Sequence, residues 1–114
     1  MKLARGVAGF LLWGAALCAY AHAHLEQATP ADGSVLSAPP AQLVLRFSEA
    51  ARLTAFSIQG ASTRQNVTAL PEQPQTTIVV PLPPLAPGHY VLSFRVVGAD
   101  GHVVPGQVRF TLSR

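Results

Sequence analysis

The stretch His89-Tyr-Val-Leu-Ser-Phe-Arg-Val-Val97 decides the fold of this chain of 114 residues. From Tyr90 to Val96, every second residue is large and apolar. Successive side chains of a β-strand point to opposite faces, so this alternation predicts a strand with one buried face. Pro87-Gly88 directly before it is typical of a turn. The stretch is therefore predicted to be the longest strand of a sheet.

Shorter stretches of the same character lie on both sides of it, and signals for helices are almost absent. We predict strands over Gln42–Phe47, Thr54–Gln59, Arg64–Thr68, Thr76–Val80 and Gln107–Leu112. Short strands separated by turn signals favour an antiparallel β-sandwich, with the prolines in connections or at edges. Besides the long strand, the residues expected to face the core are Leu43, Leu45, Phe47, Phe56, Ile58, Val108, Phe110 and Leu112.

The beginning of the chain has the pattern of a secretory signal peptide. Lys2 and Arg5 precede the apolar run GVAGFLLWGAALC, and Ala19-Tyr-Ala21 supplies small residues where a signal peptidase cuts. We predict a signal peptide over residues 1–21 and one domain over residues 22–114. An uncleaved membrane anchor is the alternative, although the apolar run is short for a membrane span.

Removal of this leader changes what the composition implies. Cys18 is the single cysteine, so the mature domain has no disulfide, thiolate metal site or cysteine nucleophile. A lipoprotein is disfavoured because Leu17 stands where a small residue would precede the lipidated cysteine. The formal charge of +3 falls to +1, with six basic and five acidic residues remaining. Without a cluster of lysines or arginines, a nucleic-acid partner is not expected.

Cleavage after Ala21 would make His22 the first residue of the mature protein. Its free α-amine and its imidazole Nδ1 could then close a chelate ring on one metal ion. The amine does not need to be neutral beforehand, because a metal can displace its proton. A second candidate element is the segment Val97-Gly-Ala-Asp-Gly-His-Val103.

In that segment, Asp100 and His102 are two positions apart, so in an extended chain they point to the same side. Gly101 between them allows the backbone to adjust. Together with His22 they would provide three nitrogens and one oxygen, a set that suits tetragonal Cu(II). Each part also has an ordinary interpretation: Asp-Gly is common in turns, and histidines near a cleavage junction can be polar spacing. His89 is expected to be exposed or partly packed.

Several motifs together resemble the CopC family of periplasmic copper-resistance proteins. The resemblance spans essentially the whole mature chain, and the N-terminal histidine with the late Asp-x-His is its most specific part. The motifs, in order, are His22-Ala-His-Leu, Thr29-Pro-Ala-Asp-Gly-Ser34, Leu45-Arg-Phe-Ser-Glu49, Leu85-Ala-Pro-Gly-His-Tyr90 and Val96-Val-Gly-Ala-Asp-Gly-His102.

The resemblance implies an all-β, cupredoxin-like or immunoglobulin-like Greek-key β-sandwich that binds Cu(II) in the periplasm. The implied metal ligands are His22, Asp100 and His102, and Glu49 matches an acidic residue near the copper site of the family. The implied role is copper resistance, storage or delivery, and not that of an enzyme. A polytopic membrane protein of copper uptake is the implied recipient.

The chain departs from the family pattern at three points. Its single methionine, Met1, belongs to the leader, so the methionine-rich Cu(I) site of some members is missing. Phe94 stands where the family has a tryptophan, and Gly98 replaces a common serine. These changes leave the Cu(II) hypothesis intact.

Alternatives remain for both the ligands and the function. Cleavage after Ala23 would make His24 the terminus, and cleavage after Ala21 would also allow a local site of amine, backbone amides and His24. The alternative functions are a metal-free immunoglobulin-like interaction module and a copper oxidase with a histidine brace. The oxidase is disfavoured because Asp100 would occupy the copper plane that such an enzyme leaves open.

Overall fold

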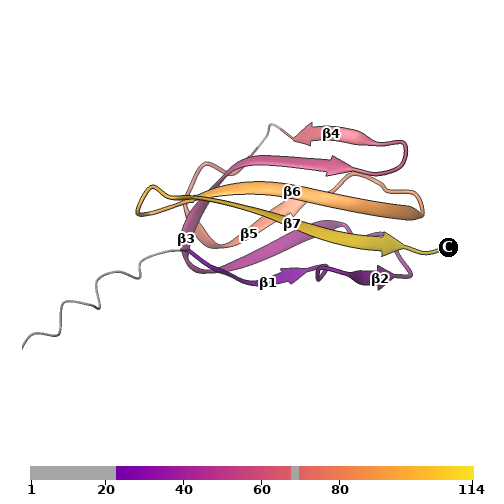
Figure 1. Ribbon diagram of the computed structural model, residues 1–114, viewed down its shortest axis with the longest axis horizontal. Coiled ribbons are helices and arrows are strands. Elements are labelled where there is room, and N and C mark those ends of the chain that lie inside the picture. Colours follow the sequence, from indigo (N-terminus) through magenta and orange to yellow (C-terminus); the bar gives the residue numbers. More distant parts are fainter. Residues whose placement is uncertain (1–22, 68–69) are drawn as a thin grey trace, which may run out of the picture.

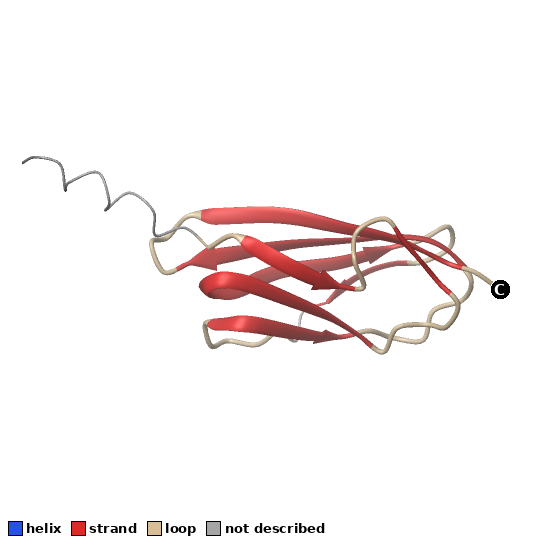
Figure 2. Cartoon of the chain, turned by 90° about the horizontal axis from the view of Figure 1, so that it is seen from below, coloured by secondary structure: helices blue, strands red, loops and turns tan. Residues whose placement is uncertain are grey.

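The computed structural model describes residues 23–67 and 70–114, and all regular structure in this part of the chain is β-strand (Figures 1 and 2). This confirms the predicted all-β class. None of the described residues forms a helix with the length and hydropathy needed to span a membrane. The strands are β1 (Leu25–Thr29), β2 (Ser34–Leu36), β3 (Gln42–Gln59), β4 (Arg64–Val67), β5 (Gln75–Pro81), β6 (Gly88–Gly98) and β7 (Val103–Leu112).

Strand β3 belongs to both layers of the sandwich. Its first half pairs with β1 and β5, and its second half pairs with β4 and β6. Ala51 lies at the change of layer, because it pairs with Gln75 of β5 and with Gly98 of β6. Figure 1 shows β3 curving around one end of the molecule between these two courses. The sequence predicted two separate strands here, and that was wrong because the residues between them stay extended through the bend.

The two layers follow from this pairing. One layer contains β1, the first half of β3, and β5, while the other contains β4, the second half of β3, β6 and β7. All these neighbours are antiparallel, whereas β2 joins the outer side of β7 in parallel. The hairpin of β6 and β7 is central to the second layer, and its turn projects at the end where β3 changes layer.

The space between the layers is filled by the alternating apolar residues of the strands. All the residues predicted to face inward are buried, with exposed fractions of 6% or less. Phe47 of the first layer meets Phe94 of the second edge to face, with ring centroids 6.4 Å apart. Tyr90 stacks on Phe110 with centroids 5.3 Å apart. The core therefore ties the two layers together through aromatic contacts as well as aliphatic ones.

Three features of the strands were not predicted. Both β1 and β2 are additional, and β7 begins at Val103 and includes Pro105. Strand β2 pairs with β7 only from Phe110 to Leu112, so the part of β7 that contains Pro105 pairs with β6 alone. A proline is tolerated there because the missing N–H is on an unpaired edge.

Candidate metal centre

The turn between β6 and β7 is a compact loop closed by its own backbone. The N–H of Gly98 donates to the carbonyl of His102 at 3.0 Å, and the N–H of Gly101 donates to the carbonyl of Gly98 at 3.0 Å. Gly101 has φ = 86°, a left-handed conformation that glycine adopts without steric cost. A tight turn followed by a left-handed glycine is a common way to join two antiparallel strands. The backbone thus fixes the positions of Asp100 and His102.

The side chains of Asp100 and His102 meet above this loop. His102 Nδ1 lies 2.8 Å from Asp100 Oδ2, and the N–H of His102 donates to Asp100 Oδ1 at 3.0 Å. Both carboxylate oxygens are therefore engaged by the same histidine. The Asp100 side chain is 21% exposed and that of His102 is 67% exposed. The structure thus brings together an oriented carboxylate and an accessible imidazole, as their spacing suggested.

The N-terminal part of the described chain enters the fold beside this loop. The N–H of His24 donates to Ser48 Oγ at 2.9 Å, and the N–H of Ser48 donates to the carbonyl of His24 at 2.8 Å. Ala23 is 3% exposed. A Cβ placed on Gly98 would lie 3.8 Å from the backbone nitrogen of Ala23 and 3.1 Å from Asp100 Oδ1. The backbone of Ala23 is therefore close to the Asp100 carboxylate.

The remaining candidates differ in their positions. His22 lies outside the described residues. His24 is exposed, and Glu49 is half-buried on β3 without an ion pair in the described part of the chain. His89 lies at the far end of β6 from the turn, exposed, with Nδ1 2.8 Å from Thr111 Oγ1. The expectation that His89 is exposed or partly packed is confirmed.

Within residues 23–67 and 70–114, no group of three histidine, cysteine, aspartate or glutamate residues is placed to hold a metal ion. The described chain thus supplies the pair of Asp100 and His102 and, beside it, the start of the fold at Ala23. The sequence did not reveal the roles of Ala23 and Ser48, which anchor the beginning of the described chain to the sandwich. A serine in the middle of a strand carries no signal of such a contact.

Comparisons with known proteins agree with the resemblance drawn from the motifs. The model of the CopC domain family matches residues 25–113, which include Asp100 and His102. Protein YobA of Escherichia coli K12 is 38% identical over 101 residues, covering 82% of this chain and 80% of that protein. Copper resistance protein C of Pseudomonas syringae pv. tomato is 35% identical over 108 residues, covering 81% of each.

Solved structures give the same result for the fold. CopC from Methylosinus trichosporium OB3b has a TM-score of 0.64 and 31% identity, covering 81% of this chain and 94% of that one. PcoC, a methionine-rich copper resistance protein from Escherichia coli, has a TM-score of 0.55 and 30% identity. The match covers 82% of this chain and 100% of that one. These matches support the predicted cupredoxin-like sandwich. With the family model matched along nearly all of the described residues, the chain belongs to the CopC family.

Proposed function

We propose that this protein binds Cu(II) after export to the periplasm and stores the ion or delivers it. The ligands in this proposal are the α-amine and Nδ1 of His22, a carboxylate oxygen of Asp100, and an imidazole nitrogen of His102. The observation that carries the proposal is the contact of 2.8 Å between Asp100 Oδ2 and His102 Nδ1, next to the start of the fold.

The separation of these two atoms suits a shared metal ion. In protein metal sites, nitrogen and oxygen ligands typically lie about 2.0–2.1 Å from the ion, so two ligands at right angles are about 2.9 Å apart. The observed 2.8 Å is close to that value without movement of the backbone. A set of nitrogens with one carboxylate favours Cu(II) over Cu(I), which prefers sulfur ligands.

The position of Ala23 supports His22 as the source of the remaining ligands. Ala23 is buried and its backbone nitrogen is close to Gly98, so the preceding residue is joined to the chain beside the hairpin turn. One residue is long enough to bring an amine and an imidazole to Asp100. His24 is a less suitable first residue, because its own N–H already donates to Ser48.

Relatives and ligand count both favour a role in copper handling. Proteins named copper resistance protein C occur among the relatives from Escherichia coli and Pseudomonas syringae. Four protein atoms around the ion would fill the copper plane and leave no strong position for a substrate, which favours storage or delivery over catalysis. We further propose a polytopic membrane protein of copper uptake as the recipient.

Electron paramagnetic resonance of the exported protein titrated with Cu(II) tests the ligand set. We expect a tetragonal, nitrogen-rich signal that is lost or strongly altered in His22→Ala and in His102→Ala. His89→Ala is the matched control, because this histidine lies at the opposite end of β6. An unaltered signal in both ligand variants would refute the proposal. N-terminal sequencing of the same protein should begin at His22, since the leader must be removed to create the amine.

A further inference from the structure

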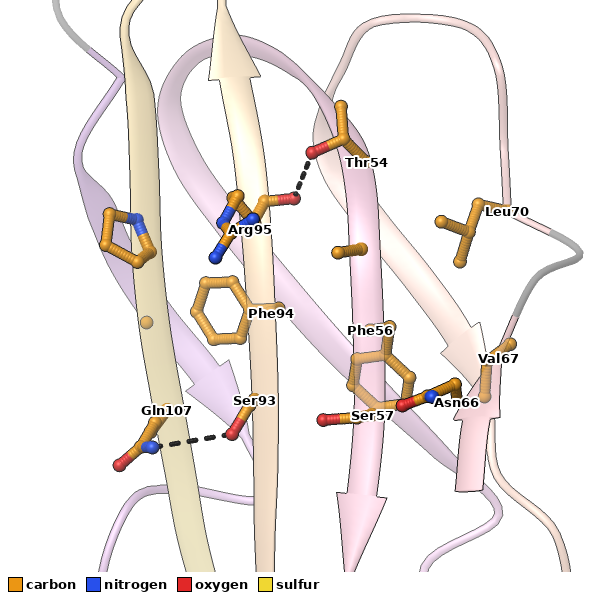
Figure 3. Close-up of a pocket in the computed structure, with 13 residues that line it drawn as sticks. Thr54, Phe56, Ser57, Asn66, Val67, Leu70, Ser93, Phe94, Arg95 and Gln107 are labelled. Atoms are coloured by element: carbon orange, nitrogen blue, oxygen red, sulfur yellow. Dashed lines mark hydrogen bonds between the residues drawn. The ribbon is translucent and has the colours of Figure 1, made fainter. Parts of the chain in front are cut away.

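The outward face of the second layer has a distinct chemistry that the copper site does not use. Register places its outward residues in rows across the strands. One row contains Asn66, Ser57, Ser93 and Gln107, one from each of β4, β3, β6 and β7 (Figure 3). Each member is a hydrogen-bonding side chain without charge, and Gln107 Nε2 donates to Ser93 Oγ at 3.4 Å.

This row lies in a hollow of about 770 Å³ on the face of the sheet. The short side chains of Ala55, Ser57 and Ser93 are among the residues that line it, together with Leu70 and Pro105. Leu70 lies beyond the end of β4 (Figure 3). The hollow is open to solvent and spans all four strands of this layer, from Asn66 of β4 to Gln107 of β7, and we call it a groove. A groove that exposes its occupant on one side suits an extended chain better than a small molecule, which proteins usually enclose.

Arginines surround the row of neutral residues. Arg95 is opposite Ala55 inside the groove, Arg52 is opposite Val97 toward the turn of the hairpin, and Arg64 is opposite Gln59 toward the other end. Within the residues that the structure describes, these three arginines form no ion pair. Arg109 also faces outward, but Asp32 lies 3.8 Å from its Nε.

No acidic residue occupies an outward position on the paired parts of β3, β4, β6 and β7. Three cations without counter-ions on one face are notable in a predicted mature chain whose net charge is +1. Such a face attracts anions and repels basic partners. Arginine in particular presents a planar fork of donors that matches a carboxylate.

We propose that this groove, here called the arginine groove, binds an extended acidic segment of a partner protein. Carboxylates of the segment would pair with Arg95 and with Arg52 or Arg64, while the amides and hydroxyls between them would bond its backbone and polar side chains. Arg52, Arg95 and Arg64 stand level with positions 52, 55 and 59 of β3, so at about 3.3 Å per residue they are spaced roughly 10–13 Å apart along the strands. That spacing is close to the distance between side chains four residues apart in an extended chain, which lie on the same side of it. A membrane surface fits less well, because Arg95 lines a hollow together with neutral hydrogen-bonding side chains that can engage a peptide backbone.

The groove also leads to the copper-binding end of the molecule. Arg52 pairs with Val97 directly beside Gly98, where the loop that carries Asp100 begins. Val103, the first residue of β7, is 54% exposed on the same face. An acidic segment lying along the groove would therefore end beside the candidate metal centre. Binding to the groove does not depend on that centre being occupied.

Fluorescence anisotropy with a labelled ten-residue peptide of alternating glutamate and serine tests this proposal on the exported protein. A peptide with glutamine in place of glutamate is the matched probe. We expect binding of the acidic peptide only, weakening by about tenfold or more in Arg95→Gln and falling as salt rises from 50 to 200 mM. Arg46→Gln on the first layer, where Arg46 donates to Gln27, removes the same charge and should change affinity less than twofold.

Equal loss of affinity in Arg95→Gln and Arg46→Gln would overturn the proposal, as would equal binding of both peptides. Three further results would overturn it in favour of another occupant. Succinate that binds as tightly as the peptide would indicate a small carboxylate site. Sedimentation of the protein with phosphatidylglycerol vesicles, without peptide binding, would indicate a membrane. A dimer abolished by Arg95→Gln would indicate a second copy of the chain. A far-ultraviolet circular dichroism spectrum and a urea midpoint like those of the unaltered protein report correct folding of each variant.

Discussion

At the scale of single residues, Gly98 occupies a position where a side chain would disturb the candidate copper site. A Cβ there would lie 3.1 Å from Asp100 Oδ1, closer than ordinary contact, and 3.6 Å from Ala23 Cβ. The carboxylate cannot move away freely, because His102 holds both of its oxygens. The absence of a side chain at Gly98 therefore leaves room for the Asp100 carboxylate in this chain.

We predict that Gly98→Ala weakens Cu(II) binding by about tenfold, the usual cost of disturbing groups that orient metal ligands. Competition with a chromophoric chelator measures the affinity. Ala99→Ser, at an exposed position of the same turn, should leave affinity unchanged. Equal affinity in Gly98→Ala and in the unaltered protein would show that Asp100 tolerates the displacement.

Gly106 makes room for an aromatic ring in the core. A Cβ at Gly106 would overlap Cζ of Phe94, whose ring also meets Phe47. We predict that Gly106→Ala destabilises the protein by about 1–3 kcal/mol, because extra volume in a packed core forces side chains out of place. Urea unfolding measures the loss. Combining it with Phe94→Leu should recover part of the stability, whereas additive losses would contradict this packing.

Much at this scale could be predicted from the sequence, but not the contacts between distant residues. Alternation placed Leu92 and Val108 in the core, and the spacing of Asp100 and His102 correctly suggested that they meet. The sequence could not reveal that Ser48 binds the backbone of His24, because a hydrogen bond between residues far apart in the chain leaves no local pattern.

At the scale of elements, β3 joins the two layers into one unit. Leu45 in its first half and Ile58 in its second half are both 0% exposed, each in a different layer. A strand shared by two layers cannot leave one without disturbing the other. The sandwich should therefore unfold in a single step.

We predict that Leu45→Ala and Ile58→Ala each lower the free energy of unfolding by about 2–5 kcal/mol, the range for removing a buried aliphatic side chain. Urea unfolding followed by far-ultraviolet circular dichroism and by tyrosine fluorescence should give coincident transitions for both variants. Ser57→Ala, facing outward, is the control. Separate transitions for the two probes would mean that the layers unfold independently.

The strands were predictable where alternation was strong and missed where it was weak. Strand β1 is mostly exposed, and β2 has three residues of which none is fully buried, so neither has an apolar period to detect. Their existence depends on pairing with β3 and β7, which a local pattern does not encode. The division of β3 into two predicted strands arose because the polar residues Ser48 and Glu49 interrupt its alternation.

At the scale of the whole molecule, copper should stabilise the fold. The proposed ligands come from the N-terminus and from the turn between β6 and β7, so the complete set exists only in the folded protein. A ligand that binds only the native state stabilises it by about 4 kcal/mol at a free concentration a thousand times its dissociation constant. We therefore predict a higher melting temperature with Cu(II), reversed by a chelator.

Differential scanning calorimetry measures this effect. His102→Ala should melt at the same temperature with and without Cu(II), and His89→Ala should respond as the unaltered protein does. A copper-dependent rise that persists in His102→Ala would point to a local site at the N-terminus. No rise in the unaltered protein would support a metal-free interaction module instead.

The paired hydrogen bonds between His24 and Ser48 have a practical consequence for anyone preparing this protein. They hold the start of the described chain beside the hairpin. If the leader is removed before His22 as proposed, extra residues ahead of it would replace its primary amine with a peptide nitrogen while the sandwich still folds. We therefore expect a purification tag at that end to give folded protein that binds little Cu(II). At the opposite end, Arg114 is exposed just beyond the bond from Ser113 to Leu36, and an affinity handle there would leave the chemistry undisturbed.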